Sequence, residues 1–579
     1  MTNAEQATES AGAAIARLLK DNGINTVFAL AGTAHAYLLD ELDKAGFHIV
    51  PSRSENATVA AADGYARVTG KPGFALIVGH QGLPNALGGI RTAQLACSPV
   101  IVLAGTGGGQ PEALDEETND LLDLVKPFVK YARAVPSAVR MEEYFNAAIH
   151  KAMTGRRGVA VLDVPTHFAR QDIPARPQFP SRKSIPTAPE PNLEAVAEAA
   201  SLLANAKRPL ILAGSGAALS HAEESVLALA ERLNAPVFCH ALGRGLVPED
   251  NDRSWSWGLA QVAAKHADVV IAVGIRLQQR IGFGMAPRFN PDVKFIQIDV
   301  EPSEIGRNRT IDVAIQADAD STVRKIVDAI GERAVASEGR AWVGEALTVR
   351  TERLDSFGND ESAPIHPLQI GRALMKAMPA DTIFVADGAD VYNWMTGVVR
   401  IRSPRSYMDH YPLGSMGIGT PLALGAAAGA REMAEESGTT PRPVVLVTGD
   451  GSFGFYPTEF NSAALADLKI VCIVSNDGAW GTEKNAQLNA YGRVVNCEIG
   501  QCDYHLFGPA LGINGTKVTR ADEIGPAIRD ALDADGSTIV NIITDTDAGL
   551  VRKKDPRLQM VTFEDLKSSL DAHHVIDLA

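Results

Sequence analysis

The chain has 579 residues, of which 46% are hydrophobic and 21% charged, values typical of a globular protein with about three domains. Its formal net charge of -15 argues against nucleic acid or an anionic membrane as a partner. No apolar run approaches the roughly 20 residues of a membrane helix, and the polar start "MTNAEQATES" is unlike a secretion signal. Five scattered cysteines fit a reducing compartment, so we expect a cytoplasmic protein without a membrane or nucleic-acid partner.

An apolar stretch, a glycine-containing turn and a helical segment recur in that order along the chain. The first third has "TVFALAGT", "FALIVGHQG", "PVIVLAGTGGG" and "VAVLDVPTH", and the middle has "PLILAGSG", "DVVIAVGIRL" and "KFIQIDVEPSE". The last third has "IFVADGAD", "PVVLVTGDG", "KIVCIVSNDG" and "STIVNIIT". Short β-rich runs that alternate with helices predict parallel sheets covered on both faces, and hence an α/β fold of three doubly wound domains.

Two polar, proline-rich segments, residues 173–192 and 355–367, separate these series and are typical of linkers. We therefore predict domains at residues 1–180, 191–345 and 365–545. A tail over residues 546–579 has no evident place in the third sheet.

Two predicted strands of the last third end on polar residues. Asp450 stands between Gly449 and Gly451, and Asn476 ends the next strand. The carboxyl ends of parallel strands form the ligand-binding edge of a sheet, and carboxylate and amide oxygens suit Mg²⁺. Gly451 would let the backbone approach a phosphate, and a helix that starts near Tyr456 would offer N–H groups. Alternatively, "DG" and "ND" are only turn formers.

Three motifs resemble those of thiamine-diphosphate enzymes. The first is Gly449-Asp450-Gly451 followed by Asn476, which lies 26 residues after the aspartate. The second is "SRSENATVAAADGYARVTGKPG", where Glu55 falls on the position of the cofactor-activating glutamate, and the third is "GSMGIGTPLALGAAAGA". The resemblance covers nearly the whole chain and is to the acetolactate synthase-like superfamily, with pyrimidine-binding, middle and diphosphate-binding domains in that order.

The resemblance implies a role for each matching residue. Asp450, Asn476 and the Gly478 carbonyl would bind Mg²⁺ on the diphosphate, Met416 would separate the two cofactor rings, and the Gly414 carbonyl would face the 4′-amino group. The implied cofactor-binding set is Gly414, Met416, Gly449, Gly451, Ser452, Asn476 and Gly478.

Glu55 would hydrogen-bond the pyrimidine ring of the neighbouring subunit's cofactor and promote loss of the thiazolium proton. The alternative for Glu55 is a solvated helix charge, although the small, apolar residues around it indicate a buried helix. The expected assembly is a homo-oligomer, a homotetramer, with active sites between subunits.

The segment "NDGAWGTEKNAQLNAYGR" resembles that of 2-hydroxyacyl-CoA lyases acting on short, branched substrates such as 2-hydroxyisobutyryl-CoA. Glu483 would then move the substrate proton, and the products would be a ketone or aldehyde and formyl-CoA, reversible as an acyloin condensation. The alternative is an exposed helical glutamate paired with Lys484 or a nearby charge. An oxalyl-CoA decarboxylase, an acetolactate synthase-like carboligase on 2-oxo acids and a non-catalytic member of the fold are the rival functions.

His35 and the pair His80-Gln81 follow predicted strands of the first domain, on loops that line the pocket in the resembling enzymes. They would orient the acyl carbonyl or hydroxyl of the substrate. Each histidine could equally be a hydrogen-bonded structural residue.

An acyl-CoA substrate is strongly anionic and needs cations. Candidates are Arg400 and Arg402, which would face one side of a strand, then Arg405, and in the tail Arg552, Lys553 and Lys554. The alternative is a solvated surface strand. The tail would form a lid over the acyl pocket or a subunit interface.

In the middle domain, Gly214 and Gly216 of "LAGSGAALS" form a short Gly-X-Gly turn, weak evidence for a nucleotide on its own. By the resemblance, ADP or the nucleotide end of CoA binds there in some relatives, and we expect no FAD.

Overall fold

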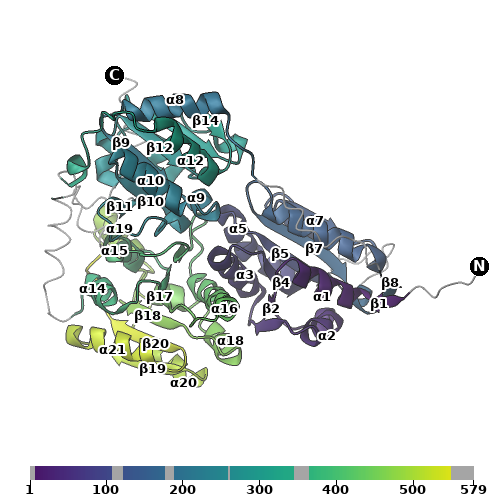
Figure 1. Ribbon diagram of the computed structural model, residues 1–579. Helices are drawn as coiled ribbons and strands as arrows, with labels where there is room; N and C mark the ends of the chain where they lie inside the picture. The colour runs from purple at the N-terminus through teal and green to yellow at the C-terminus, as the bar shows by residue number, and fades with distance from the viewer. Residues whose placement is uncertain are drawn as a thin grey trace, which may run out of the picture.

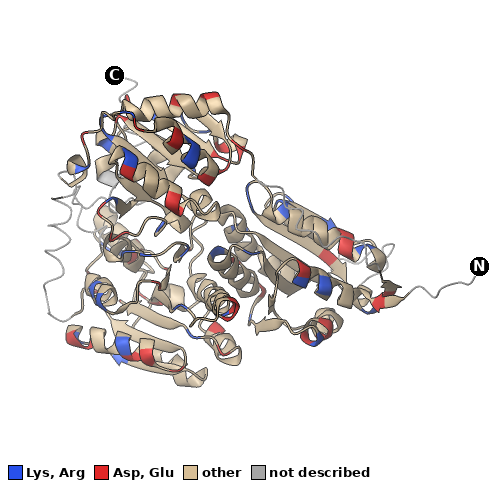
Figure 2. Ribbon diagram, in the orientation of Figure 1, with Lys and Arg blue, Asp and Glu red and all other residues tan. Residues whose placement is uncertain are grey.

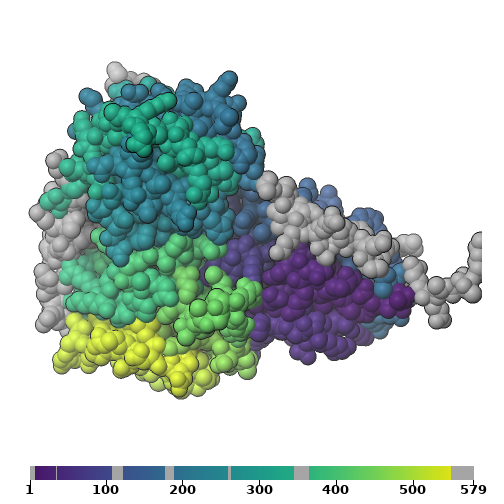
Figure 3. Space-filling model, viewed as in Figure 1, coloured from purple at the N-terminus to yellow at the C-terminus, as the bar shows by residue number. Residues whose placement is uncertain are grey.

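Three six-stranded sheets, each with only parallel pairings, form the framework of the computed structural model, which describes residues 7–106, 121–175, 188–257, 261–344, 348 and 364–549 (Figure 1). Helices cover the sheets, and the space-filling view shows the three parts as lobes in contact (Figure 3). The predicted α/β fold with three doubly wound sheets is confirmed. The domain boundaries given above stay a prediction.

The first sheet has the order β3-β2-β4-β5-β7-β6. Its strands are β2 (Thr26–Ala29), β3 (His48–Pro51), β4 (Gly73–Val78), β5 (Val100–Thr106), β6 (Tyr131–Ala134) and β7 (Val159–Pro165). The main helices are α1 (Ala11–Asp21), α2 (Ala36–Lys44), α3 (Glu55–Thr69), α4 (Gly82–Asn85), α5 (Leu87–Ala96) and α7 (Met141–Met153). A separate antiparallel pair joins β1 (Thr8–Ser10) to β8 (Asp172–Pro174), so the first predicted linker begins as a strand.

The second sheet has the order β11-β10-β9-β12-β13-β14. Its strands are β9 (Pro209–Ala213), β10 (Val237–Cys239), β11 (Ser254–Ser256), β12 (Val269–Val273), β13 (Lys294–Asp299) and β14 (Val313–Gln316). The main helices are α8 (Leu193–Ala204), α10 (Glu223–Leu233) and α12 (Ala319–Ile330).

The third sheet has the order β16-β15-β17-β18-β20-β19. Its strands are β15 (Ile383–Ala386), β16 (Tyr407–Asp409), β17 (Val444–Gly449), β18 (Val471–Asn476), β19 (Asn514–Val518) and β20 (Thr538–Ile543). The helices include α14 (Pro367–Ala377), α15 (Asp390–Val398), α16 (Gly419–Ser437), α17 (Asp450–Phe453), α18 (Glu459–Leu465), α19 (Gly481–Tyr491) and α21 (Ala521–Asp533).

Helices α3 and α16 lie side by side and join the first sheet region to the third (Figure 1). Both are rich in alanine and glycine, and their backbones approach closely. A Cβ at Gly64 would lie 2.1 Å from the Leu422 carbonyl oxygen, and one at Gly425 would lie 1.8 Å from that of Ala61. Every residue of α3 from Glu55 to Val68 is buried, as its small side chains predict. This packing places Glu55, the first residue of α3, against the third sheet region.

A buried ion pair ties the second region to the third. The Arg244 guanidinium donates to both oxygens of the Glu249 carboxylate at 2.8 and 2.7 Å, and to the Val399 carbonyl at 2.6 Å. Glu249 also accepts the Ile401 N–H at 2.9 Å. Removing one partner would leave a buried, unpaired charge.

We therefore expect Glu249→Ala to lower the free energy of unfolding by about 3 kcal/mol in urea titrations, if unfolding is two-state. Glu338→Ala, which removes an exposed pair with Arg208, is the control and should cost about 1 kcal/mol or less. Equal losses in the two variants would contradict the role assigned to the buried pair.

Acidic and basic side chains are interspersed along the outer helices (Figure 2). Within the ranges described above, none of the helices combines the length and apolar character needed to cross a bilayer.

Candidate active site

A cavity of about 150 Å³ lies at the carboxyl ends of the neighbouring strands β17 and β18. Residues from six segments of the chain line it. They include Met416, Asp450, Ser452, Asp477, Trp480 and Glu483. The parallel pairing of β17 with β18 brings both strand ends to one edge, as the sequence predicts.

Asp450 is buried at the start of the short helix α17. Its Oδ1 accepts the Gly451 N–H at 2.8 Å, and its Oδ2 accepts the Gly478 N–H at 2.7 Å. Burial and the nearby Asp477 carboxylate raise the pKa of Asp450, and burial raises the pKa of Asp477. The prediction that a helix begins near Tyr456 is wrong. One helix, α17, begins at Asp450, and the next, α18, begins at Glu459.

Asn476 is fully buried at the end of β18. Its Nδ2 donates to the Cys502 carbonyl at 2.8 Å and to Asn541 Oδ1 at 3.1 Å. Its Oδ1 has no hydrogen-bond partner among the described residues, which is costly for a buried polar atom. The orphaned amide oxygen, the buried Asp450 carboxyl group and the partly buried one of Asp477 are a donor set that fits Mg²⁺. No group of three or more His, Cys, Asp or Glu side chains suited to a metal occurs in the described part of the chain.

The Gly478 carbonyl is already engaged in this conformation. It accepts the N–H groups of Ile499 at 2.9 Å and Gly500 at 3.0 Å. Its predicted role as a metal ligand would need the turn at residues 499–500 to move, and it stays a prediction. Asp477, which the sequence reading treated only as part of a turn, supplies a further carboxylate at the cavity.

Met416 lines the cavity, and Ser452 Oγ lies 3.9 Å from its sulfur. The buried Asp387 carboxylate holds the segment that carries Met416, because it accepts the N–H groups of Gly417 at 3.3 Å and Gly419 at 2.9 Å. Gly414 is in a left-handed turn of the same segment. Asp387 was not predicted from the sequence, because in "IFVADGAD" it resembles an ordinary turn residue.

Gly451 leaves no room for a side chain beside the cavity. A Cβ there would lie 2.5 Å from the Trp480 ring, whereas one at Gly454 would lie at an ordinary 3.5 Å from its nearest neighbour, the Gly451 carbonyl oxygen. We expect Gly451→Ala to weaken binding of a diphosphate ligand by about tenfold, and Gly454→Ala to leave it unchanged, in calorimetric titrations with thiamine diphosphate and Mg²⁺. Equal affinities of the two variants for thiamine diphosphate would show that the Trp480 ring moves aside without weakening binding.

Glu483 lies in the first turn of α19, is exposed, and lines the cavity. It forms no hydrogen bond or ion pair with the residues that the structure describes. The alternative pairing with Lys484 is not found, since Lys484 Nζ donates to Thr546 Oγ1 at 2.8 Å.

Glu55 is 7% exposed and accepts a long hydrogen bond of 3.4 Å from Asn85 Nδ2. It is not among the residues that line the cavity of its own chain. Its predicted action on a neighbouring subunit's cofactor remains a prediction.

His35, His80 and Gln81 do not line this cavity either. Burial lowers the pKa of His35 to about 4, so its imidazole is neutral near pH 7. Neither ring nitrogen of His35 has a hydrogen-bond partner in the described ranges. His80 is partly buried and Gln81 is exposed.

The prediction that Arg400 and Arg402 share the face of a strand is wrong, because residues 399–402 lie in no strand. Arg400 donates to the Glu249 carbonyl at 3.2 Å, Arg402 to that of Met378 at 2.6 Å and Arg405 to that of Thr69 at 3.2 Å. These contacts give the three guanidinium groups structural roles between segments. Arg552, Lys553, Lys554 and most of the predicted lid lie outside the described residues.

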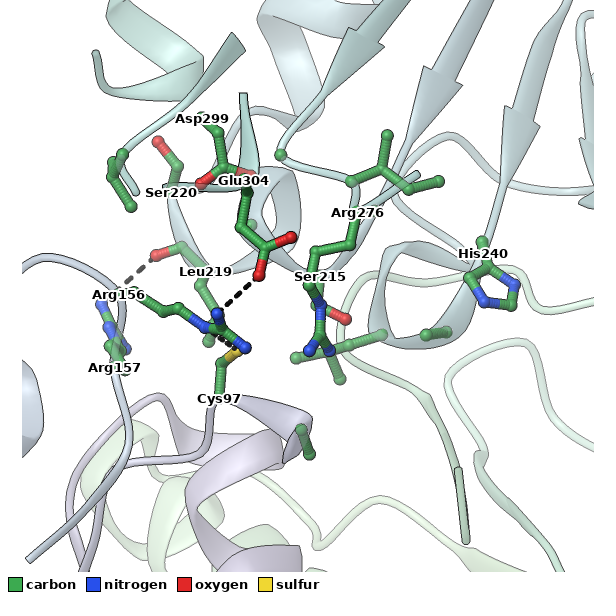
Figure 4. A pocket seen from close by; sticks show the side chains of 18 of the residues that line it. Cys97, Arg156, Arg157, Ser215, Leu219, Ser220, His240, Arg276, Asp299 and Glu304 are labelled. Atoms are coloured by element: carbon green, nitrogen blue, oxygen red, sulfur yellow. Dashed lines mark hydrogen bonds and ion pairs between the residues drawn. The ribbon is translucent and has the colours of Figure 1, made fainter. Parts of the chain in front are cut away.

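A second cavity of about 390 Å³ lies where the three sheet regions meet (Figure 4). Arg156 donates to Glu304 Oε1 at 2.6 Å and to Cys97 Sγ at 3.3 Å. In Figure 4, Arg276 extends toward the same space as Arg156 and Glu304. Gly214 and Gly216 also line this cavity, as do three further polar residues, Ser215, Asp299 and Asp318.

Three domain families match the chain in order. They are "Thiamine pyrophosphate enzyme, N-terminal TPP binding domain" over residues 9–120, the "central domain" over 196–326 and the "C-terminal TPP binding domain" over 387–542. The chain is 30% identical to the acetolactate synthase large subunit of Mycobacterium tuberculosis, over 94% of this chain and 98% of that protein. It is 25% identical to human 2-hydroxyacyl-CoA lyase 1, over 94% and 96%.

Among solved structures, the benzoylformate decarboxylase from Polynucleobacter necessarius superposes with a TM-score of 0.79 at 22% identity, over 93% of this chain and 99% of that one. This likeness establishes the three-domain fold.

Proposed function

Because the chain belongs to the thiamine pyrophosphate enzymes of the acetolactate synthase-like type, we propose that it is a carbon–carbon lyase that cleaves a short 2-hydroxyacyl-CoA. The products from 2-hydroxyisobutyryl-CoA would be acetone and formyl-CoA. The observation that carries this proposal is Glu483, a carboxylate that has no partner among the described residues and lies on the wall of the cavity that contains Asp450 and Met416. Similarity to 2-hydroxyacyl-CoA lyase supports the substrate class.

Residues that line the cavity, together with the adjoining Asn476, fit the cofactor. Asp450 and Asn476 would hold Mg²⁺, the N–H groups at the start of α17 would meet the diphosphate, and Met416 would pack against the cofactor rings. When bound, thiamine diphosphate supplies a nucleophilic carbon and an electron sink for carbon–carbon cleavage.

Glu483 would handle the substrate proton. As a carboxylate it accepts the proton of the 2-hydroxyl while the bond between the first and second carbons breaks, so the ketone or aldehyde leaves uncharged. As the resulting acid it returns the proton to the carbon that becomes the formyl group. One proton is taken and one is returned, so the residue ends each turnover as it began.

The direct test is to incubate the purified protein with thiamine diphosphate, Mg²⁺ and 2-hydroxyisobutyryl-CoA and to detect acetone and formyl-CoA by mass spectrometry. Conversion of pyruvate to acetolactate, with no cleavage of the CoA ester, would instead identify a carboligase like the acetolactate synthase relative. Decarboxylation of oxalyl-CoA alone would identify the other rival.

We expect Glu483→Gln to lower kcat by about 100-fold, because glutamine keeps the shape but cannot carry the proton. Release of acetone under saturating substrate measures this. Glu224→Gln, which removes an exposed carboxylate from α10, is the matched control and should keep wild-type kcat. A kcat within about threefold of wild type in Glu483→Gln would show that Glu483 is an exposed residue that does not transfer the substrate proton.

The second cavity would take ADP or the nucleotide end of CoA, with Arg156 and Arg276 as the cations nearest the phosphates. We further propose, from the family, that the active unit is a homo-oligomer, with Glu55 acting across the subunit contact.

A further inference from the structure

The buried carboxylate of Glu459 contacts the chain immediately before Glu55. Glu459 is the first residue of α18 and is 1% exposed. It accepts the backbone N–H of Arg53 at 3.0 Å through Oε1 and at 3.3 Å through Oε2. Ser462 Oγ donates to Oε2 at 2.9 Å. A carboxylate of the third sheet region thus holds the entry to α3 in the first.

Two neighbouring contacts continue this junction. Tyr456 OH accepts a hydrogen bond from Asn56 Nδ2, and Asn461 Oδ1 accepts one from the Arg53 guanidinium. The residues on both sides of Glu55 are therefore bonded to the segment that follows Asp450 along the chain.

Helix α3 does not need Glu459 as its cap. Ser54 is the N-cap, and its Oγ already accepts the Ala57 N–H at 3.2 Å. The hydrogen bonds from Arg53 to Glu459 lie outside the helix and set the direction in which the chain enters it. Burial raises the pKa of Glu459, because the charged carboxylate is less stable away from water. The hydrogen bonds to the carboxylate must offset this cost in free energy.

We propose that Glu459 is a positioning residue for Glu55: by holding the Arg53 backbone it fixes the start of α3, and with it the direction in which the Glu55 carboxylate points. This inference rests on the role of Glu55 in the proposed function, but not on the choice of substrate. A small displacement of a proton-transferring group lowers its rate steeply.

The test measures exchange of the C2 proton of bound thiamine diphosphate for deuterium, without any acyl substrate. In Glu459→Ala we expect exchange to slow by about 10- to 100-fold, while the cofactor Kd changes by less than about threefold. Glu459→Gln keeps one amide acceptor, so its exchange rate should lie between those of Glu459→Ala and wild type. This variant replaces Glu459→Ala in the test if the alanine variant does not fold. Asp467→Asn changes an exposed carboxyl group in the turn after α18 and should keep the wild-type exchange rate.

A second readout uses the cofactor-free protein. Deuterium uptake by backbone amides of residues 51–60 should rise in Glu459→Ala and stay at the wild-type level in Asp467→Asn. Wild-type exchange and uptake in Glu459→Ala would overturn the proposal, as would a loss of cofactor affinity as large as the loss of exchange. Absence of lyase activity would instead affect the proposed function alone, because neither readout uses a CoA ester.

Discussion

Glu55→Gln is expected to slow exchange of the C2 proton of bound thiamine diphosphate by about 1,000-fold, with little change in cofactor affinity. Glutamine fills the same buried space and can keep the contact with Asn85. It cannot hold a proton shared with the pyrimidine ring, so the loss should appear in exchange and in kcat together. A residue that is buried for packing alone would show neither loss.

The measurement is rapid-quench exchange into deuterium oxide, followed by NMR of the released cofactor. Glu41→Gln, on α2 of the same sheet region, is the matched control, because it removes a carboxylate that pairs with a surface lysine, Lys44. Exchange within about threefold of wild type in Glu55→Gln would remove Glu55 from the reaction.

The interior strands of the sheets could be predicted from the sequence more readily than the edge strands. β17 and β18 are buried on both faces and form continuous apolar runs. The edge strand β19 is mostly exposed and reads "NGTKV", and the edge strand β14 is four residues long with alternating exposure. Short, partly polar strands carry little signal, because they lack the continuous apolar run that marks a strand buried on both faces.

The residues of the site likewise divide into those that could be predicted from the sequence and those that could not. Asp450, Met416 and Glu483 belong to local motifs, and the parallel packing of the strands brings them to one cavity. Asp387 and Glu459 act through backbone amides of distant segments, and Glu459 is 406 positions from its partner Arg53. No local spacing in a single sequence encodes such a contact.

At Arg400 and Arg402, in contrast, a local sequence pattern led to a wrong prediction. Alternation at Arg400 and Arg402 suggests a strand, yet two positions are too few to distinguish a strand from an extended loop, and Pro404 follows closely. The loop carries both side chains to backbone carbonyls, Arg400 to the one at Glu249 and Arg402 to the one at Met378.

Asp450→Asn should weaken binding of thiamine diphosphate by about 100-fold or more when Mg²⁺ is present. Asparagine keeps the shape of the side chain but cannot ionise to the carboxylate that a divalent cation would bind, at a site whose other donors are Asp477 and the orphaned Oδ1 of Asn476. The divalent cation, and through it the diphosphate, should lose most of its attraction. Calorimetric titration of the cofactor at fixed Mg²⁺ measures the change.

Chelation separates a metal ligand from a residue that merely supports the fold. EDTA should weaken cofactor binding by wild type to the level of Asp450→Asn, and should weaken the variant no further, because both changes remove the same interaction. Asp535→Asn, at an exposed position in the same sheet region, should behave as wild type in both titrations. If EDTA still weakened the variant by the wild-type factor, the cation would be held elsewhere, and Asp450 would serve only to orient the Gly451 and Gly478 amides.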